Sequence, residues 1–182
     1  MDTFYTSCIV VKKFKKPLDT PIKRVYNKGV RKRKEVQKMM TYCFDMDGTI
    51  ADLYGVNGWL EMLIASDETP YAIAKPLVNM SRLARRIHKV QAQGHRVEII
   101  SWLSKSGTPE YNIAVTKAKI EWLAKHLPSV TFNAIHIVPY GTPKSTVTRM
   151  ENAILFDDEE RNLNEWNKGN AYTPDKIFEI MA

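Results

Sequence analysis

The stretch YCFDMDGTIADLYG, residues 42–55, closes a short apolar run with two carboxylates, Asp45 and Asp47, and continues at once into Gly48 and Thr49. The run is too short for a helix and ends in a turn, which predicts a strand buried in a parallel sheet. Two like charges in one small site repel each other unless a cation or a shared proton lies between them. The stretch therefore predicts the first core strand, with a metal ion or a shared proton at its end.

The length and composition predict one globular core. The chain has 182 residues, of which 44% are hydrophobic, enough for one substantial core and too few for two full domains. No apolar run approaches the ~20 residues of a membrane span, and no secretory signal is recognisable at the N-terminus. Cys8 and Cys43 form no CxxC pair and are expected to be reduced thiols. We therefore expect a cytoplasmic protein without a membrane partner.

The positive charge of the chain lies at its N-terminus. Residues 1–39 hold twelve Lys and Arg against three acids, a net +9, whereas residues 40–182 carry −2. We expect 1–39 to be a mostly irregular basic extension and 40–182 to be the folded core. The favoured interpretations are a solvated tail, or a stretch ahead of the true translation start near Met39. The alternative is a sequence-independent contact of residues 12–38 with nucleic acid.

Strand-like and helix-like segments alternate from residue 41 onward. Helices are expected at 79–93 with its end at Gly94, at 109–127 with Thr108 as cap, at roughly 159–168, and at 174–181 with Thr173 as cap. Further strands are expected at 96–101, 134–139 and 153–156. This alternation predicts an α/β fold, a three-layer, doubly wound parallel sheet of Rossmann-like type.

Polar residues follow each expected strand. They are Asp45 and Asp47 after the first, Ser101 at the end of the second, Lys144 after the third, and Asp157 with Asp158 after the fourth. The carboxyl ends of parallel strands meet in one crevice, so these residues are expected to form one site. Carboxylates suit Mg²⁺, and an ammonium group with a hydroxyl suits the oxygens of a transferring phosphoryl group. The pattern favours Mg²⁺ and phosphoryl transfer.

The same residues carry a family resemblance. FDMDGTIAD, Ser101 in IISWLS, Lys144 in YGTPKS and the pair in ILFDDEERN resemble the four ordered motifs of the haloacid dehalogenase superfamily of phosphohydrolases, over residues 42 to about 166. KAKIEWLAKHLP and the double-aspartate fourth motif are similar to the 5′(3′)-deoxyribonucleotidase branch. The resemblance implies a phosphomonoesterase that works through an aspartyl-phosphate.

The resemblance also implies a role for each residue. Asp45 would be the nucleophile, and Asp47 would protonate the leaving oxygen and then activate the hydrolytic water. Ser101 would hydrogen-bond a phosphoryl oxygen, and Lys144 would neutralise charge on the nucleophile and the phosphoryl group.

The metal ligands are implied in the same way. Mg²⁺ would be held by Asp45, the backbone carbonyl of Asp47 and the acids Asp157 and Asp158 of the fourth motif. By analogy with the branch, Asp158 is favoured as the direct ligand and Asp157 as its neighbour, although the residues alone do not separate them.

Substrate choice depends on residues 51–79, which are expected to form a small helical cap. A small cap leaves the crevice open, and the branch resemblance favours a (deoxy)nucleotide 5′-phosphatase with a small phosphorylated substrate. The cap segment is shorter than is usual in that branch, which leaves base recognition open. Trp102 either stacks on a base or, as we favour, packs in the interior. The alternatives are a polynucleotide-end phosphatase and a nucleic-acid-associated binding protein that uses the basic extension.

Overall fold

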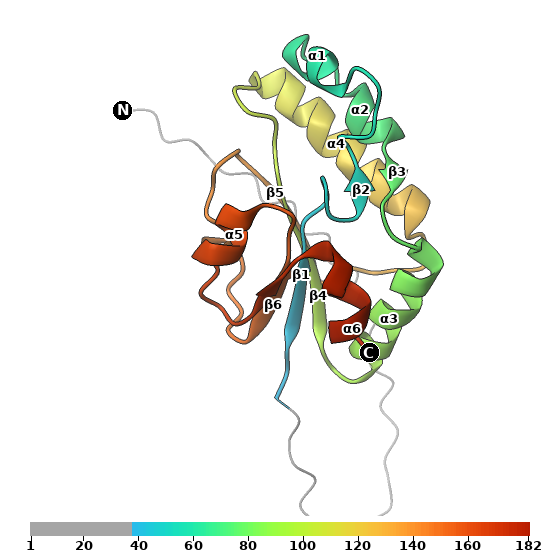
Figure 1. Ribbon diagram of the computed structural model, residues 1–182, viewed down its shortest axis with the longest axis vertical. Helices are drawn as coiled ribbons and strands as arrows, with labels where there is room; N and C mark the ends of the chain where they lie inside the picture. Colours follow the sequence, from blue (N-terminus) through green and yellow to red (C-terminus); the bar gives the residue numbers. More distant parts are fainter. Residues whose placement is uncertain (1–37) are drawn as a thin grey trace, which may run out of the picture. The chain divides into compact units, whose positions relative to one another are not determined.

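The computed structural model describes residues 38–182, and its centre is a five-stranded parallel sheet (Figure 1). The strands are β1 Thr41–Phe44, β4 Arg96–Trp102, β5 Ala134–Val138, β6 Ala153–Phe156 and β7 Ala171–Tyr172. They lie in the order β5-β4-β1-β6-β7, and every neighbouring pair is parallel. The predicted α/β fold is confirmed, and β1 lies at the centre of the sheet, where the sequence first pointed.

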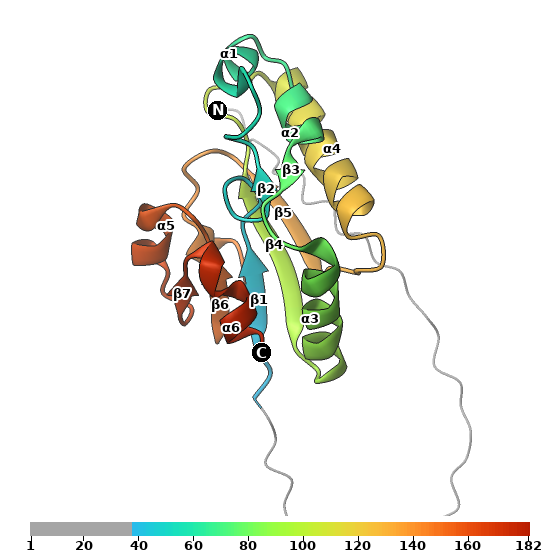
Figure 2. The same ribbon diagram turned by 45° about the vertical axis from the view of Figure 1, so that its right-hand side comes forward.

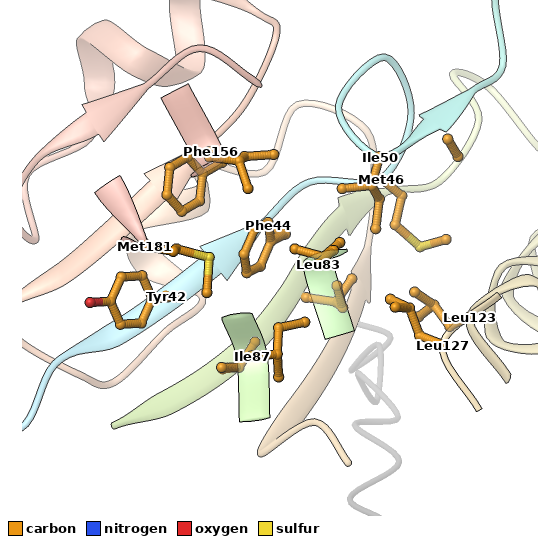
Figure 3. Packing of buried hydrophobic residues seen from close by; sticks show 14 of the residues in the cluster. Tyr42, Phe44, Met46, Ile50, Leu83, Ile87, Leu123, Leu127, Phe156 and Met181 are labelled. Atoms are coloured by element: carbon orange, nitrogen blue, oxygen red, sulfur yellow. The ribbon is translucent and has the colours of Figure 1, made fainter. Parts of the chain in front are cut away.

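One face of the sheet carries the main hydrophobic core (Figures 2 and 3). Helices α3 Met80–Ala92, α4 Pro109–His126 and α6 Ile177–Ile180 contribute to the same buried cluster as this face. The cluster includes Tyr42, Phe44, Ile99, Phe156, Leu83, Ile87, Leu123, Leu127 and Met181. Successive side chains of a strand alternate between the faces, so Tyr42 and Phe44 point into this core while Cys43 points to the other side.

The helix boundaries follow the local signals in the sequence. The Asn79 side chain accepts a hydrogen bond from the Arg82 amide at 2.9 Å and begins α3. Gly94 has a φ of 87°, the left-handed conformation expected just after that helix. The Thr108 hydroxyl accepts from the Tyr111 amide at 3.2 Å and begins α4. The predictions for Gly94 and Thr108 are confirmed, whereas Asn79, expected inside the helix, is its cap.

The opposite face is covered by the C-terminal part of the chain. Cys43, Ile100 and Leu155 pack there with Trp166, which follows the short helix α5 Glu160–Glu165. The short 3₁₀ helix η1, Lys144–Thr146, comes directly before β6 in the order of elements along the chain. Figure 2 shows α5 on the side of the sheet away from α3 and α4. Both faces are therefore covered, which gives the three layers that the alternation predicts.

The C-terminal elements differ from the prediction. Helix α5 ends at Glu165 rather than near residue 168, because Trp166 adopts an extended backbone and its indole donates to the Ala153 carbonyl at 3.0 Å. The last segment is a 3₁₀ turn, η2 Pro174–Lys176, followed by α6. Thr173 makes no capping hydrogen bond to the backbone; its hydroxyl donates to Asp175. The edge strand β7 was not predicted.

Residues 51–79 form the small cap that the sequence predicts. A two-stranded antiparallel ribbon, β2 Ala51–Asp52 with β3 Lys75–Pro76, encloses two short helices, α1 Trp59–Ile64 and α2 Thr69–Ile73. Their apolar residues pack against the N-terminal half of α4 in a separate cluster that includes Leu53, Tyr71, Tyr111, Val115 and Ala118. The cap is therefore held by α4 as well as by its own ribbon.

The basic extension predicted for residues 1–39, and its contact with nucleic acid through residues 12–38, lie outside the described residues except at their last positions. Among residues 38–182, no helix has the length and apolarity needed to cross a lipid bilayer.

Candidate active site

Three carboxylates meet at the carboxyl ends of the neighbouring strands β1 and β6. Asp45, Asp157 and Asp158 each offer an oxygen that lies within 4.8 Å of the others. Asp45 and Asp157 are buried, with 6% and 0% of their surfaces exposed, whereas Asp158 reaches solvent. The parallel pairing of β1 with β6, in which Phe44 lies opposite Phe156, brings the residues that follow both strands together. The convergence predicted from the strand ends is observed for these acids.

Lys144 lies between two of these acids. Its Nζ is 2.8 Å from Asp45 Oδ1 and 2.6 Å from Asp157 Oδ2, and only 3% of the residue is exposed. Burial by itself would lower the pKa of Lys144, but the charges of Asp45 and then Asp157 outweigh it and raise the pKa. Lys144 is therefore a permanent positive charge beside Asp45, at the place that the sequence predicts for it.

The two acids of the fourth motif have different surroundings. Asp157 Oδ2 accepts from Lys144, Asp157 Oδ1 accepts from the Glu159 amide at 3.0 Å, and the Asn162 amide group contacts both oxygens at 3.1 and 3.2 Å. In Asp158, Oδ1 accepts a single side-chain hydrogen bond, from the Thr49 hydroxyl at 3.3 Å. Asp157 is thus fixed by its neighbours, and Asp158 keeps oxygen lone pairs for another ligand.

The charge cluster changes the acidity of Asp158. Desolvation, together with the negative charges of Asp45 and Asp157, raises the pKa of Asp158 to about 6. A carboxyl group with this pKa changes its charge just below neutral pH. A cation bound between the acids would remove the repulsion that holds the pKa up.

Asp47 belongs to a different part of the site. Its carboxylate is not one of the clustered acids; instead, Oδ2 accepts a hydrogen bond from Lys119 Nζ at 2.6 Å. Desolvation raises the pKa of Asp47, the Lys119 ammonium opposes this rise, and the Asp45 charge adds to it, so the pKa stays above its usual range. A carboxyl group of raised pKa is suited to give and take a proton near neutral pH.

Lys119 was not predicted as a site residue from the sequence. This residue is 1% exposed, and its Nζ also donates to the Ser101 hydroxyl at 2.9 Å and to the Trp102 carbonyl at 2.6 Å. The helical phase carried a signal: position 119 follows the buried Val115 by four residues and precedes the buried Trp122 by three, which places it on the inner face of α4.

Ser101 lies at the end of β4, but its hydroxyl points to Lys119. The residue is 0% exposed and is not among those that line the cavity described next. Its predicted contact with a phosphoryl oxygen therefore stays a prediction. Trp102, next to it, is 8% exposed, and its indole donates to the Thr142 carbonyl at 2.8 Å. Trp102 is therefore largely buried, as favoured, and it also lines the cavity, so stacking on a base stays a prediction.

A cavity of about 470 Å³ opens between the carboxylate cluster and the cap. One end is polar and holds Asp45, Asp47, Lys144, Asp157 and Asp158. The rest of the wall is mostly apolar and aromatic, with residues of the cap, of the end of β4 and of the loops after β4 and β5: Leu53, Tyr54, Trp59, Leu60, Leu63, Ile64, Tyr71, Trp102, Leu103 and Tyr140. Ser104, Lys105 and Ser106, in the loop after β4, add polar groups to this wall. A ligand that fills it would have an anionic group at one end and an apolar or planar group at the other.

The polar end fits a hard divalent cation. Its donors are carboxylate oxygens, which Mg²⁺ prefers, and Asp45 Oδ1 is a buried oxygen that forms no hydrogen bond of good geometry, although Lys144 lies beside it. Three acids face one lysine there, so a bound cation would bring the local charge closer to neutrality. Asp45 and Asp158 have the open oxygens, and Asp157 orients Lys144.

Comparisons with known proteins give only distant likenesses. No protein-family model matches the chain, and a search of curated proteins finds no match. One similar solved structure is the D,D-heptose 1,7-bisphosphate phosphatase from Burkholderia thailandensis, with a TM-score of 0.43 and 18% identity over 70% of each chain. Another is a chain of a Pnkp1/Rnl/Hen1 complex, with a TM-score of 0.47 and 15% identity; the match covers 74% of this chain and 45% of that one.

Proposed function

We propose that this chain is a Mg²⁺-dependent phosphomonoesterase of the haloacid dehalogenase type, with a nucleotide as its substrate. One observation carries the proposal: the buried Asp45 lies 2.8 Å from Lys144 and shares a carboxylate cluster with Asp157 and Asp158, at the polar end of a cavity. An anionic nucleophile can approach an anionic phosphate ester only where positive charge surrounds both; Lys144 supplies part of that charge at this corner of the cavity, and a bound Mg²⁺ would supply the rest.

Asp45 is the nucleophile in this proposal. One of its oxygens forms a bond to phosphorus while the bond from phosphorus to the leaving oxygen breaks, which produces an aspartyl-phosphate and an alcohol. Water then attacks the phosphorus and releases inorganic phosphate and the free carboxylate. Lys144 neutralises charge on Asp45 and on the phosphoryl oxygens throughout. Mg²⁺, held by Asp45, Asp158 and the Asp47 carbonyl, would add positive charge at the same oxygens.

Asp47 transfers the protons. As a carboxylic acid it donates a proton to the leaving oxygen in the first step, and as a carboxylate it takes a proton from water in the second, so the cycle closes without a net proton change on the enzyme. The raised pKa of Asp47 makes its protonated form more accessible and so supports the first of these roles. Its carboxylate lies outside the metal-binding cluster, and within residues 38–182 only Oδ2 is engaged, by Lys119.

The apolar end of the cavity supports a nucleotide as the substrate. Tyr54 and Tyr140 line the cavity and are 52% and 47% exposed, so part of each ring remains open to a ligand. Tyr54 packs edge-on against Trp59 with ring centroids 5.1 Å apart, and Tyr140 packs against Trp102 at 5.0 Å. Rings supported in this way are suited to stack on a planar base while the phosphate reaches Asp45.

The test measures phosphate release by the full-length protein with and without Mg²⁺. The substrates are nucleoside 5′- and 3′-monophosphates, sugar phosphates, and oligonucleotides phosphorylated at either end, and Asp45→Asn is the control. We expect release from a mononucleotide, and none by the variant. Undiminished Mg²⁺-dependent release by Asp45→Asn would remove Asp45 as the nucleophile, and selective release from sugar phosphates would remove the nucleotide assignment.

Polynucleotide ends are a second candidate substrate. The exposed side of α3 presents Arg82, Arg85, Arg86 and Lys89 around a shallow hollow, and none of them lies within 4.0 Å of a carboxylate in residues 38–182. Clustered cations of this kind attract a phosphate backbone without reading its sequence. Release from oligonucleotide ends alone would favour this candidate over a mononucleotide.

A further inference from the structure

Lys119 has no role in the chemistry described so far, yet it is the cation closest to Asp47. We propose that Lys119 is a positioning residue that holds the Asp47 carboxyl in the orientation needed to protonate the leaving oxygen. The inference rests on the proposed function, since it assigns a task within that reaction.

Every hydrogen-bond donor of the Lys119 ammonium has an acceptor. Asp47 Oδ2, the Ser101 hydroxyl and the Trp102 carbonyl lie 2.6, 2.9 and 2.6 Å from Nζ. A side chain with three donors and three partners has one favoured position. Since Ser101 and Trp102 belong to β4, a strand paired on both sides with β1 and β5, the ammonium is tied to the sheet. Asp47 is held to the sheet in turn.

The hydrogen bond leaves one oxygen of Asp47 for the reaction. Lys119 engages Oδ2, and among the described residues no hydrogen bond reaches Oδ1. Asp47 is also among the residues that line the cavity. A carboxyl group that is held at one oxygen and open at the other is oriented rather than neutralised, so proton transfer would not require a search over side-chain rotations.

A buried lysine carries a cost that favours a specific role. Transfer of an ammonium group from water to a protein interior costs several kcal/mol unless partners compensate. An apolar residue on the same inner face of α4, as at Val115 and Trp122, would avoid that cost. Lys119 also differs from Lys144 in its carboxylate partners, because Lys144 contacts Asp45 and Asp157 whereas Lys119 contacts Asp47.

Lys119 also touches the cap. Its Nζ lies 4.9 Å from the centre of the Tyr71 ring, and Tyr71 is buried in α2 and lines the cavity. The same ammonium thus contacts the cap, the end of β4 and the proton-transferring acid. This arrangement fixes Asp47 relative to the wall against which the leaving group would lie.

The test compares two esters that differ in their need for a proton. An alkyl ester such as a nucleoside monophosphate must have its leaving oxygen protonated, whereas p-nitrophenyl phosphate releases a stable phenolate. We compare kcat/KM of Lys119→Met with that of Lys117→Met, a variant of the same helix whose side chain is 74% exposed. The ratio kcat/KM follows the transfer to Asp45 and is insensitive to the later hydrolysis.

We expect Lys119→Met to lose about 100-fold in kcat/KM on the nucleoside monophosphate and less than about threefold on p-nitrophenyl phosphate. The Kd for Mg²⁺, measured by calorimetry, should match that of Lys117→Met because Lys119 is outside the carboxylate cluster. Equal losses on both esters, or a Kd weakened by about tenfold, would overturn the inference, since Lys119 would then shape the whole site.

Folding is checked on the same samples by thermal unfolding, with Lys119→Gln as a second variant that keeps a hydrogen-bond donor. If neither variant folds, the inference is overturned and Lys119 is a residue of stability. A wild-type protein that hydrolyses neither ester would count against the proposed function itself. An active wild type with an unaffected Lys119→Met would count against the lysine alone.

Discussion

Gly48 lies directly against the carboxylate of Asp158. It has a φ of 73°, and a Cβ atom placed on it would collide with Asp158 Oδ2 and with the Tyr54 ring. The turn after β1 can therefore bring its backbone close to the fourth-motif acid only because residue 48 has no side chain. The Asp47-Gly48 pair that follows β1 thus serves the carboxylate cluster as well as the turn.

Replacing this glycine should damage metal binding. Gly48→Ala must displace Asp158, so we expect the Kd for Mg²⁺ to weaken by about tenfold or more, together with a loss of stability of about 1–2 kcal/mol from the left-handed backbone. Gly94→Ala is the matched control, because Gly94 has a φ of 87° and no atom within 4 Å of the new Cβ. Calorimetry and urea unfolding measure the two effects. Equal Mg²⁺ affinity in both variants would contradict the role given to Asp158.

Magnesium affinity should depend on pH through Asp158. Because the pKa of this carboxyl is raised to about 6 in the folded protein without metal, protons compete with the cation below that pH. We expect the Kd measured at pH 5 to be about tenfold weaker than at pH 7.5, where Asp158 is ionised. In Asp158→Asn the affinity should be low at both values and nearly constant. A wild-type Kd unchanged between them would contradict this assignment.

Removing Lys144 should destabilise the fold in a pH-dependent way. Lys144→Met leaves the buried carboxylates of Asp45 and Asp157 without their cation, which costs about 3 kcal/mol or more at pH 7.5. Burial and the Asp45 charge already raise the pKa of Asp157, and the loss of Lys144 raises it further. When the pKa of a carboxyl group is higher in the folded protein than in the unfolded one, the folded protein becomes more stable as the pH falls.

The loss of unfolding free energy caused by Lys144→Met should therefore become smaller as the pH is lowered from 7.5 to 5. Urea unfolding without metal measures it. Lys168→Met is the control, since Lys168 pairs with the exposed Glu151 at 2.6 Å, and its loss should cost less than about 1 kcal/mol at either pH. A deficit for Lys144→Met that grows on acidification would contradict the charge balance described for the site.

The aromatic wall should affect nucleotide binding and leave the chemical step unchanged. Tyr140→Ala removes a half-exposed ring from the cavity, so KM for a nucleoside monophosphate should rise by about 5- to 10-fold with little change in kcat. KM for glycerol phosphate, which has no base, should not change. Ile73→Ala, at a cap position that is 56% exposed and outside the cavity lining, is the control. A similar rise in KM for both substrates would contradict base stacking on Tyr140.

Much of the fold could be predicted because its signals are local. The apolar run before Asp45, the cap Thr108 and Gly94 each act within one element, and each predicted its element correctly. The edge strand β7 was missed because Ala171 and Tyr172 carry no alternation of their own; only their pairing with Leu155 and Phe156 makes them a strand. Helix α5 ends early for a similar reason, since the contact of Trp166 with Ala153 lies outside the helix.

The residues of the candidate site also differ in how well the sequence predicts them. Asp45, Lys144, Asp157 and Asp158 follow strand ends, and the geometry of a parallel sheet brings such positions together. Lys119 projects from the middle of a helix that carries several lysines, and one of them, Lys117, is exposed. Its charge gave no hint of burial, and only its helical phase did. The partner of Ser101 was missed for the same reason.

The ribbon of β2 and β3 ties the two ends of the cap together, with Ala51 opposite Pro76 and Asp52 opposite Lys75. The intervening residues are consequently a closed excursion from the core, which leaves and returns at nearly one point. An excursion of this form can be lengthened, shortened or exchanged while β1 and its carboxylates keep their places, provided that the new segment still covers the inner half of α4. Evolution or a protein engineer can thus change what the cavity admits without redesigning the reaction.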